Sequence, residues 1–386
     1  MKRIYSIDVL RGIVMILMAL DHVRDMMHTT SIVFQPTDLS KTTTALFFTR
    51  WVTHLCAPTF VFLSGTSAFL SMKKTNDLRA TKRFLLTRGL WLIFLEFTLV
   101  NFALWFDIHF SLFLFDVIAA IGFGFIILSL LVGCSLRTIA IIGLAIIFLH
   151  NLAPFIPGSE TSVFKTIAMP FFAPAAFPFA DGKLFIVGYP PLPWLGIMLV
   201  GFAAGSLIIR DAEKRRKNLL MLGLCSIALF VVLRLINVYG DTFPWSEQKN
   251  ALFSFLSFIN VTKYPPSLDF CLLFLGIMFV LLYALMAIKN KWTGIAAVYG
   301  KVPLFYFIVH FYIIHLLVFV MIYLQGFSSA DMVFGFSFGR PKSGSGLPLW
   351  AIYLVWIAVV ALMYPLCRRY GSYKEQHREK LWLRYL

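Results

Sequence analysis

Long apolar runs constrain the fold of this chain more than any other feature. A membrane-spanning helix needs about 20 mostly apolar residues, and the sequence contains about ten such windows. A soluble fold has no means of burying so much apolar surface, whereas a lipid bilayer accommodates it. We therefore predict an all-α fold, a polytopic membrane bundle of about ten transmembrane helices in one domain covering residues 1–386. The expected spans are 5–27, 52–72, 86–106, 110–132, 136–153, 191–209, 217–238, 267–288, 299–324 and 347–367.

The charge distribution predicts the orientation of these spans. Lysine and arginine number 34 against 18 acidic residues, a balance that in a soluble protein would suggest a nucleic-acid partner. Here the basic residues cluster between apolar runs, with 22 in the loops and tails on one side and eight in the longer loops on the other. Cytoplasmic loops collect lysine and arginine. We therefore expect both termini in the cytoplasm and no nucleic-acid partner.

The first span carries ionisable side chains, which are expensive inside a membrane and mark functional sites by default. Asp8, Arg11 and His22 lie at positions i, i+3 and i+14. At 100° per residue they fall within about 60° of one another on a helix. This stripe is typical of the wall of a site. In the alternative interpretation, Asp8 and Arg11 only pair near the inner interface.

His22 lies about 26 Å along the helix from residue 5, and so near the outer side of the bilayer. Asp21 precedes it, His28 follows within two turns, and His54 opens the second span from the same side. We expect His22 to act as a base oriented by Asp21 or another buried acid. His28 and His54 are candidates for a second base or a substrate contact, and for each an ordinary interface histidine is an equally good interpretation.

Other polar residues give weaker signals. His310 and His315 are five residues apart, so one helix does not aim both at a single metal ion, and we predict no metal site. Asn260, Lys263 and Tyr264 precede the eighth span on the outer side, where they suit an acceptor or an oxyanion, or alternatively cap that helix. The outer segment 154–190 is rich in proline and phenylalanine, and is predicted to form either a packed lid or a loop resting on the bilayer.

Several segments resemble a known family. IDVLRGIVMILMALDH, residues 7–22, resembles the opening of integral-membrane acyltransferases, in which an acid is followed by an L/F-R-G triplet and by a histidine fourteen residues after the acid. Four further segments are similar to the bacterial proteins grouped with heparan-α-glucosaminide N-acetyltransferase: HVRDMMH at 22–28, THLCAPTFVFLSGTSAFL at 53–70, PWLGIMLVGFAAG at 193–205 and NVTKYPPSLDF at 260–270.

The resemblance implies an acyltransferase-like domain in a bacterial inner (plasma) membrane. Such an enzyme takes an acetyl or other short acyl group from acetyl-coenzyme A on the cytoplasmic side and delivers it to a sugar amine or hydroxyl outside. His22 matches the family's catalytic histidine, and Asp8 and Arg11 its donor-side signature. The lysosomal relative places its reactive histidine slightly later, which makes His28 the alternative. A homodimer is left open.

The residues themselves suggest how such a reaction would proceed. Acyl transfer needs a base or nucleophile and exclusion of water. We expect His22 to deprotonate the acceptor for direct attack on the thioester, with an acyl-histidine as the alternative route. The donor's phosphates would bind Arg11 together with Arg83 and Arg88 of the basic loop, although positive-inside bias alone also places charge there.

Two rival functions use the same residues. Buried acids, an arginine and histidines also describe a proton-coupled secondary transporter of a small solute, although most such folds have a repeated half and this sequence has none. A non-catalytic scaffold needs no acid, arginine and histidine on one helical stripe.

Overall fold

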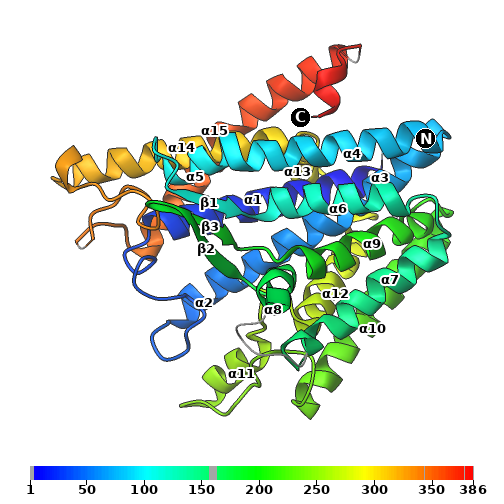
Figure 1. Ribbon diagram of the computed structural model, residues 1–386, viewed down its shortest axis with the longest axis horizontal. Coiled ribbons are helices and arrows are strands. Elements are labelled where there is room, and N and C mark those ends of the chain that lie inside the picture. The colour runs from blue at the N-terminus through cyan, green and yellow to red at the C-terminus, as the bar shows by residue number, and fades with distance from the viewer. Residues whose placement is uncertain (1–3, 156–162, 343, 378, 386) are drawn as a thin grey trace. The chain divides into compact units, whose positions relative to one another are not determined.

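The computed structural model describes residues 4–155, 163–342, 344–377 and 379–385 (Figure 1). Within these ranges the chain is mostly helical, and the all-α polytopic prediction is confirmed. Eight helices in the described ranges are long and apolar enough to cross a membrane: Thr44–Thr75, Leu78–Trp105, Leu136–Ala153, Pro191–Ile208, Ala212–Ile236, Leu268–Leu285, Pro303–Leu324 and Leu349–Gln376. Large apolar side chains stand exposed on them, including Leu235, Trp350 and Leu354, as expected of surfaces that face lipid.

Two of the ten expected spans are not among these eight. The helix α1 (Tyr5–Met27) has the expected bounds but carries five charged residues between Asp8 and Asp25. The helix α6 (Val117–Leu131) begins later than predicted and has only 15 residues, too few to cross a bilayer unaided. The ninth window contains a break, because Pro303 begins a new helix, so α13 (Lys291–Gly300) is separate from α14 (Pro303–Leu324).

The chain divides into two compact units. Unit 1 comprises residues 57–96 and the described part of 114–286. Its helices are α3 (Cys56–Thr75), α4 (Leu78–Leu95), α6, α7 (Leu136–Leu149), α8 (Val163–Ala168), α9 (Pro191–Ile208), α10 (Ala212–Ile236), α11 (Ala251–Ile259) and α12 (Leu268–Leu285).

Close glycine contacts hold the helices of unit 1 together. A Cβ atom added at Gly89 of α4 would lie 2.6 Å from the carbonyl oxygen of Gly122 in α6, and one added at Gly122 would lie 2.7 Å from that of Gly89. The same reciprocal pairing joins α7 to α9 through Gly143 and Gly196, and α10 to α12 through Gly223 and Gly276. Small residues at these crossings let backbones approach closely, as is common between membrane helices.

The segment expected to form a lid or a surface loop contains a hairpin. Strands β2 (Ala175–Ala180) and β3 (Lys183–Val187) pair antiparallel, with Gly182 in the turn at φ +68°. β1 (Leu112–Phe115) completes a small sheet of order β1-β3-β2. Residues 156–162 of the same segment lie outside the described part of the chain.

Unit 2 comprises residues 3–56, 97–113 and 287–386. It contains α1, α2 (Thr44–Trp51), a 3-10 turn (Val52–Leu55), α5 (Asn101–Trp105), α13, α14 and α15 (Leu349–Gln376). α1 packs against α13, α14 and α15. Its contact with α13 is very close, since a Cβ added at Gly12 would lie 1.7 Å from the carbonyl oxygen of Ala296, and one at Gly300 would lie 1.8 Å from that of Asp8. The glycine of the L-R-G triplet is thus required for packing.

Candidate active site

The centre of the candidate site is a pair of histidines in unit 2, His22 from α1 and His310 from α14. Nδ1 of His22 lies 2.7 Å from Nε2 of His310, well within hydrogen-bonding distance. The ring planes are only 27° apart and the centroids are 5.0 Å apart, so the two imidazoles meet edge to edge in nearly one plane. His310 is fully buried, whereas His22 is half-buried and keeps some access to solvent.

The hydrogen bonds determine which nitrogen of each ring carries a proton. Nδ1 of His310 lies 2.9 Å from the carbonyl oxygen of Tyr306. A carbonyl oxygen only accepts, so Nδ1 of His310 must donate, and in the neutral ring Nε2 is then an acceptor. His22 therefore donates its Nδ1–H to His310. Its Nε2 is left as the unprotonated, basic nitrogen.

Aromatic side chains fix the orientation of the His22 ring. It stacks on Phe311 with a centroid distance of 4.2 Å and ring planes 23° apart, and meets the edge of Phe307 at 6.4 Å. Both phenylalanines flank His310 on α14 and are buried. The hydrogen bond to His310 and the contacts with these two rings restrict rotation of the His22 imidazole, which is the preorganisation that a general base requires.

Asp21 or another buried acid was expected to orient His22, and the structure shows a hydrogen bond between His22 and His310. The Asp21 carboxylate accepts a hydrogen bond from Nη2 of Arg24 at 2.7 Å and pairs closely with Nη1 of Arg50. Arg24 also pairs with Asp25 at 2.8 Å. Because Arg50 belongs to α2, its pairing with Asp21 ties α2 to α1 directly beside His22 in the sequence.

His28 follows directly after α1 and is buried. Its Nδ1 accepts a hydrogen bond from the backbone N–H of Thr30 at 3.3 Å, and its carbonyl oxygen accepts one from Nη1 of Arg340 at 2.9 Å. Burial lowers the pKa of His28 to about 4, with the positive charges of Arg24 and Arg340 acting in the same direction. The Nδ1 lone pair of His28 is therefore engaged, and its role as the alternative reactive histidine stays a prediction.

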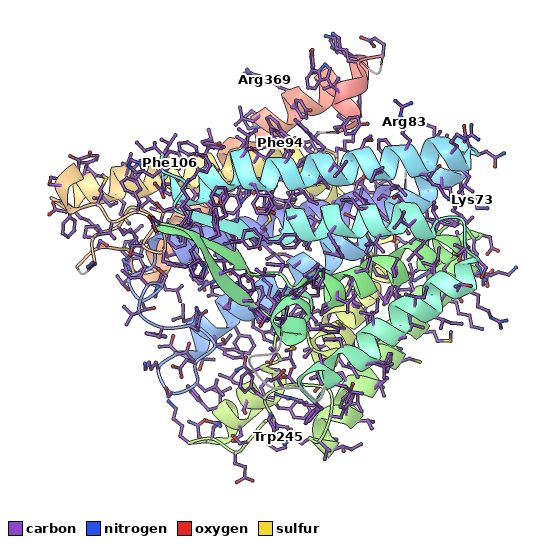
Figure 2. The ribbon with its side chains drawn as sticks, in the orientation of Figure 1. Lys73, Arg83, Phe94, Phe106, Trp245 and Arg369 are labelled. Carbon is purple, nitrogen blue, oxygen red and sulfur yellow. The ribbon has the colours of Figure 1, made fainter. Side chains whose placement is uncertain are left out.

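The predicted donor-side residues lie in both units. Asp8 and Arg11 form an ion pair of 3.9 Å near the start of α1, and Arg11 keeps 19% of its side-chain surface exposed. Arg83 and Arg88 belong to α4 of unit 1, where the exposed side chain of Arg83 extends outward from the helix (Figure 2). Their role in binding the donor stays a prediction, as does a substrate contact from His54, which is buried in the turn before α3.

The predicted acceptor residues Lys263 and Tyr264 lie in a turn of unit 1 just before α12. Lys263 is 7% exposed, and its ammonium lies 5.0 Å from the ring centre of Tyr264 and 5.8 Å from that of Tyr189. Both distances are within the range of cation–π attraction. Tyr264 itself is 38% exposed. An ammonium group flanked by two aromatic rings suits the binding of a sugar or an anionic group. The assignment of these residues to the acceptor stays a prediction.

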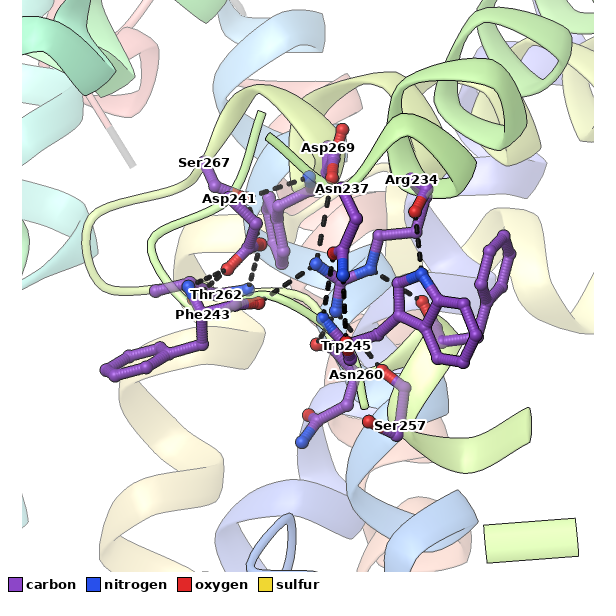
Figure 3. A network of polar contacts seen from close by, with 12 residues as sticks. Arg234, Asn237, Asp241, Phe243, Trp245, Ser257, Asn260, Thr262, Ser267 and Asp269 are labelled. Atoms are coloured by element: carbon purple, nitrogen blue, oxygen red, sulfur yellow. Dashed lines mark hydrogen bonds and ion pairs between the residues drawn. The ribbon is translucent and has the colours of Figure 1, made fainter. Parts of the chain in front are cut away.

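A hydrogen-bond network in unit 1 holds this turn in place (Figure 3). Arg234, near the end of α10 and 2% exposed, donates to four backbone carbonyl oxygens at 2.9 to 3.1 Å: those of Phe243, Ser257, Phe258 and Asn260. It also pairs with Asp269 at 3.8 Å. The backbone carbonyl of Asn260 therefore helps to hold the loop in place.

Asp241 organises the other side of the same loop. Its carboxylate accepts hydrogen bonds from the backbone N–H and the hydroxyl of Thr262 at 2.8 and 2.6 Å, and from the hydroxyl of Ser267 at 2.6 Å. Ser267 in turn caps the N-terminus of α12. Asp241 thus holds both ends of the Lys263–Tyr264 turn, at Thr262 and at Ser267.

Sequence reasoning missed two of these arrangements. His310 was considered only as a metal ligand, and nothing in the local pattern links it to His22, which is 288 positions away. The second is the set of backbone carbonyl oxygens bound by Arg234. A buried arginine in an apolar helix is a signal that it satisfies several acceptors, but the sequence does not say which ones.

Comparison with protein families gives a match. The family model described as heparan-alpha-glucosaminide N-acetyltransferase, catalytic, matches residues 3–236, more than half of the chain. No curated protein matches. The matched range includes His22, His28 and His54 and ends before Lys263 and His310.

Proposed function

Because this chain belongs to the family of the heparan-alpha-glucosaminide N-acetyltransferase catalytic domain, we propose that it moves an acetyl or other short acyl group across the membrane. The donor is acyl-coenzyme A on the cytoplasmic side, and the acceptor is an amine or hydroxyl group of a sugar on the outer side. The family implies an acetyltransferase embedded in a membrane, and the apolar helices agree with that setting. The observation that carries the proposal is the basic Nε2 of His22, held in place on a helix that also bears Asp8 and Arg11.

In the proposed reaction His22 acts as general base. The lone pair of the acceptor nitrogen or oxygen attacks the thioester carbonyl carbon, while Nε2 of His22 takes the proton from that atom. The tetrahedral intermediate then collapses, the carbon–sulfur bond breaks, and the departing thiolate receives the proton from His22. The products are the acylated sugar and free coenzyme A, and His22 returns to its starting state.

Arg11 supports the donor side of the proposal. It sits about half the length of α1 before His22, and its guanidinium is partly exposed although it pairs with Asp8. A pyrophosphate is anionic and arginine is the side chain best suited to bind it. The pantetheine arm would then extend from the inner end of α1 toward His22.

The proposal is tested by separating donor and acceptor with a bilayer. The full-length protein is reconstituted in lipid vesicles with glucosamine sealed inside and isotope-labelled acetyl-coenzyme A added outside, and the vesicle contents are analysed by mass spectrometry. We expect labelled N-acetylated sugar inside the vesicles, and none in protein-free vesicles. A panel of sugars with amine or hydroxyl groups identifies the preferred acceptor.

Two results would contradict the proposal. Product that forms only when donor and acceptor share one side would exclude transfer across the membrane. If no sugar of the panel is acylated, and acetyl-coenzyme A stabilises the protein against heating no better than acetyl-pantetheine, which lacks the nucleotide phosphates, then acyl transfer from coenzyme A is not the function.

A further inference from the structure

His310 makes a hydrogen bond to the ring of His22, and it lies beyond the residues matched by the family model. We propose that His310 is the positioning residue of the reaction: a neutral imidazole that keeps His22 in its Nδ1–H form and accepts that N–H throughout the proton transfer. The inference rests on the proposed function for its role in turnover. The hydrogen bond itself is independent of that function.

The first step of the argument is the hydrogen-bond chain. The Tyr306 carbonyl accepts from Nδ1 of His310 at 2.9 Å, and Nε2 of His310 accepts from Nδ1 of His22 at 2.7 Å. The hydrogen bond made by one nitrogen of a histidine sets the protonation of the other. One backbone carbonyl thereby determines, through His310, that the basic nitrogen of His22 is Nε2.

The second step concerns the transition state. When Nε2 of His22 takes a proton from the acceptor, the ring becomes a cation, and its bond to His310 becomes a charge-assisted hydrogen bond, roughly twice as strong as a neutral one. His310 does not compete for that proton, because two adjacent buried cations repel each other and its own N–H is committed to Tyr306. The proton stays on His22 until the thiolate leaves.

The third step explains why the partner is an imidazole and not a carboxylate. A carboxylate would hold an imidazolium strongly and raise its pKa. A neutral acceptor orients the ring equally well but leaves the imidazolium more acidic, so His22 more readily returns the proton to the departing sulfur. The His310 ring stacks on that of Tyr306 at a centroid distance of 5.3 Å, and its Nδ1 bonds the Tyr306 carbonyl, so this acceptor is held in place.

The same helix offers a matched control. His315 is also fully buried, its Nδ1 bonds the carbonyl oxygen of Ala103 at 3.2 Å, and its ring stacks on Phe106 at 4.2 Å. It therefore resembles His310 in burial, hydrogen bonding and aromatic packing. Replacing either histidine by phenylalanine keeps the ring and removes the bond to a backbone carbonyl, but only His310→Phe removes the acceptor for His22.

The kinetic test uses His310→Phe, His310→Gln and His315→Phe in the reconstituted full-length protein. We expect His310→Phe to lower kcat by about 10²–10³-fold, the lower part of the roughly 10²–10⁴-fold that a positioned general base contributes, with the KM for acetyl-coenzyme A changed less than about threefold. His310→Gln, whose side-chain oxygen can accept the N–H of His22, should recover most of the loss. His315→Phe should keep the wild-type kcat. Equal kcat values for the two phenylalanine variants would overturn the proposal.

A second measurement does not depend on turnover. In ¹⁵N-histidine spectra of the protein in lipid, wild type should show His22 with Nδ1 protonated and Nε2 bare, a signature that His310→Phe removes and His315→Phe retains. A His22 signature that is unchanged in His310→Phe, or one with the proton on Nε2 in wild type, refutes the positioning role. If the signature is as expected and no sugar is acylated, only the proposed function fails.

Discussion

Replacing Arg234 by methionine should destabilise unit 1 severely. The guanidinium is 2% exposed and satisfies four backbone carbonyl oxygens, and its neighbour Asp269 is 1% exposed. Methionine fills a similar volume but donates nothing. A hydrogen bond to a charged group contributes about 1.5–3 kcal/mol, and removing one partner of a buried ion pair costs about 3–5 kcal/mol. These contributions are not additive, so we expect a loss of at least about 4 kcal/mol.

The assay is thermal unfolding of the purified protein, combined with hydrogen exchange in the segment 237–267. In Arg234→Met the amides of this segment should exchange faster than those of α4, because the loop has lost its anchor. The double variant Arg234→Met/Asp269→Asn should be more stable than the single one, since the uncompensated carboxylate is gone. Arg216→Met is the matched control. Arg216 lies on the same helix but is exposed, with its guanidinium 4.8 Å from the ring of Tyr283, and its loss should matter by less than about 1 kcal/mol.

A change of less than about 1 kcal/mol in Arg234→Met, or a double variant less stable than the single one, would refute this reasoning. Either result would mean that the loop bearing Lys263 is held by contacts other than those of Figure 3.

Three further predictions concern unit 2. The pKa of His28 is about 4 in the folded protein and 6.5 in the unfolded chain, so the unfolded chain binds more protons between these pH values. The free energy of unfolding should therefore fall by up to about 3 kcal/mol as the pH drops from about 6.5 to 4, and it should fall less in His28→Asn. Denaturation curves that show no such fall in the wild type, or the same fall in His28→Asn, would contradict this. Gly12→Ala should prevent close packing of α1 on α13 and lower the melting temperature, at a cost of about 3 kcal/mol or more. Gly294→Ala, with open space around the new Cβ, should leave the melting temperature unchanged or raise it. Among the described residues the buried hydroxyl of Tyr306 has no hydrogen-bond partner, whereas the hydroxyl of Tyr299 donates to the Val360 carbonyl at 2.8 Å. Calorimetry should find Tyr306→Phe at least as stable as wild type and Tyr299→Phe about 1 kcal/mol less stable. The reverse order of stability would refute this reasoning.

The sequence predicts local structure well where periodicity and composition decide it. The apolar windows correspond to the eight long helices, and the first window has the bounds of α1. Exceptions have local causes: Pro303 splits the ninth window, and α6 starts at Val117 because the preceding residues form β1. The hairpin β2–β3 is short and flanked by prolines, so its alternation was too weak to distinguish it from a loop.

The sequence predicts the part of the candidate site that lies on α1, but not the partner that α14 contributes. The stripe of Asp8, Arg11 and His22 follows from helical geometry, and all three side chains are buried or half-buried in unit 2. Contacts between segments far apart in the sequence could not be predicted in this way. The acid next to His22 in the sequence was the natural candidate for its partner, but neighbours on a helix are about 100° apart, and Asp21 faces the arginines of α1 and α2. The partner comes from α14, whose packing on α1 no local pattern encodes.

The central claim, that His22 is the base of an acyl transfer, is tested most directly by measuring turnover and donor binding on one variant. With labelled acetyl-coenzyme A and the best acceptor of the panel, His22→Ala should lose at least about 10³-fold in kcat, while the Kd for acetyl-coenzyme A stays within about threefold of wild type. Turnover by His22→Ala at the wild-type rate would contradict the account.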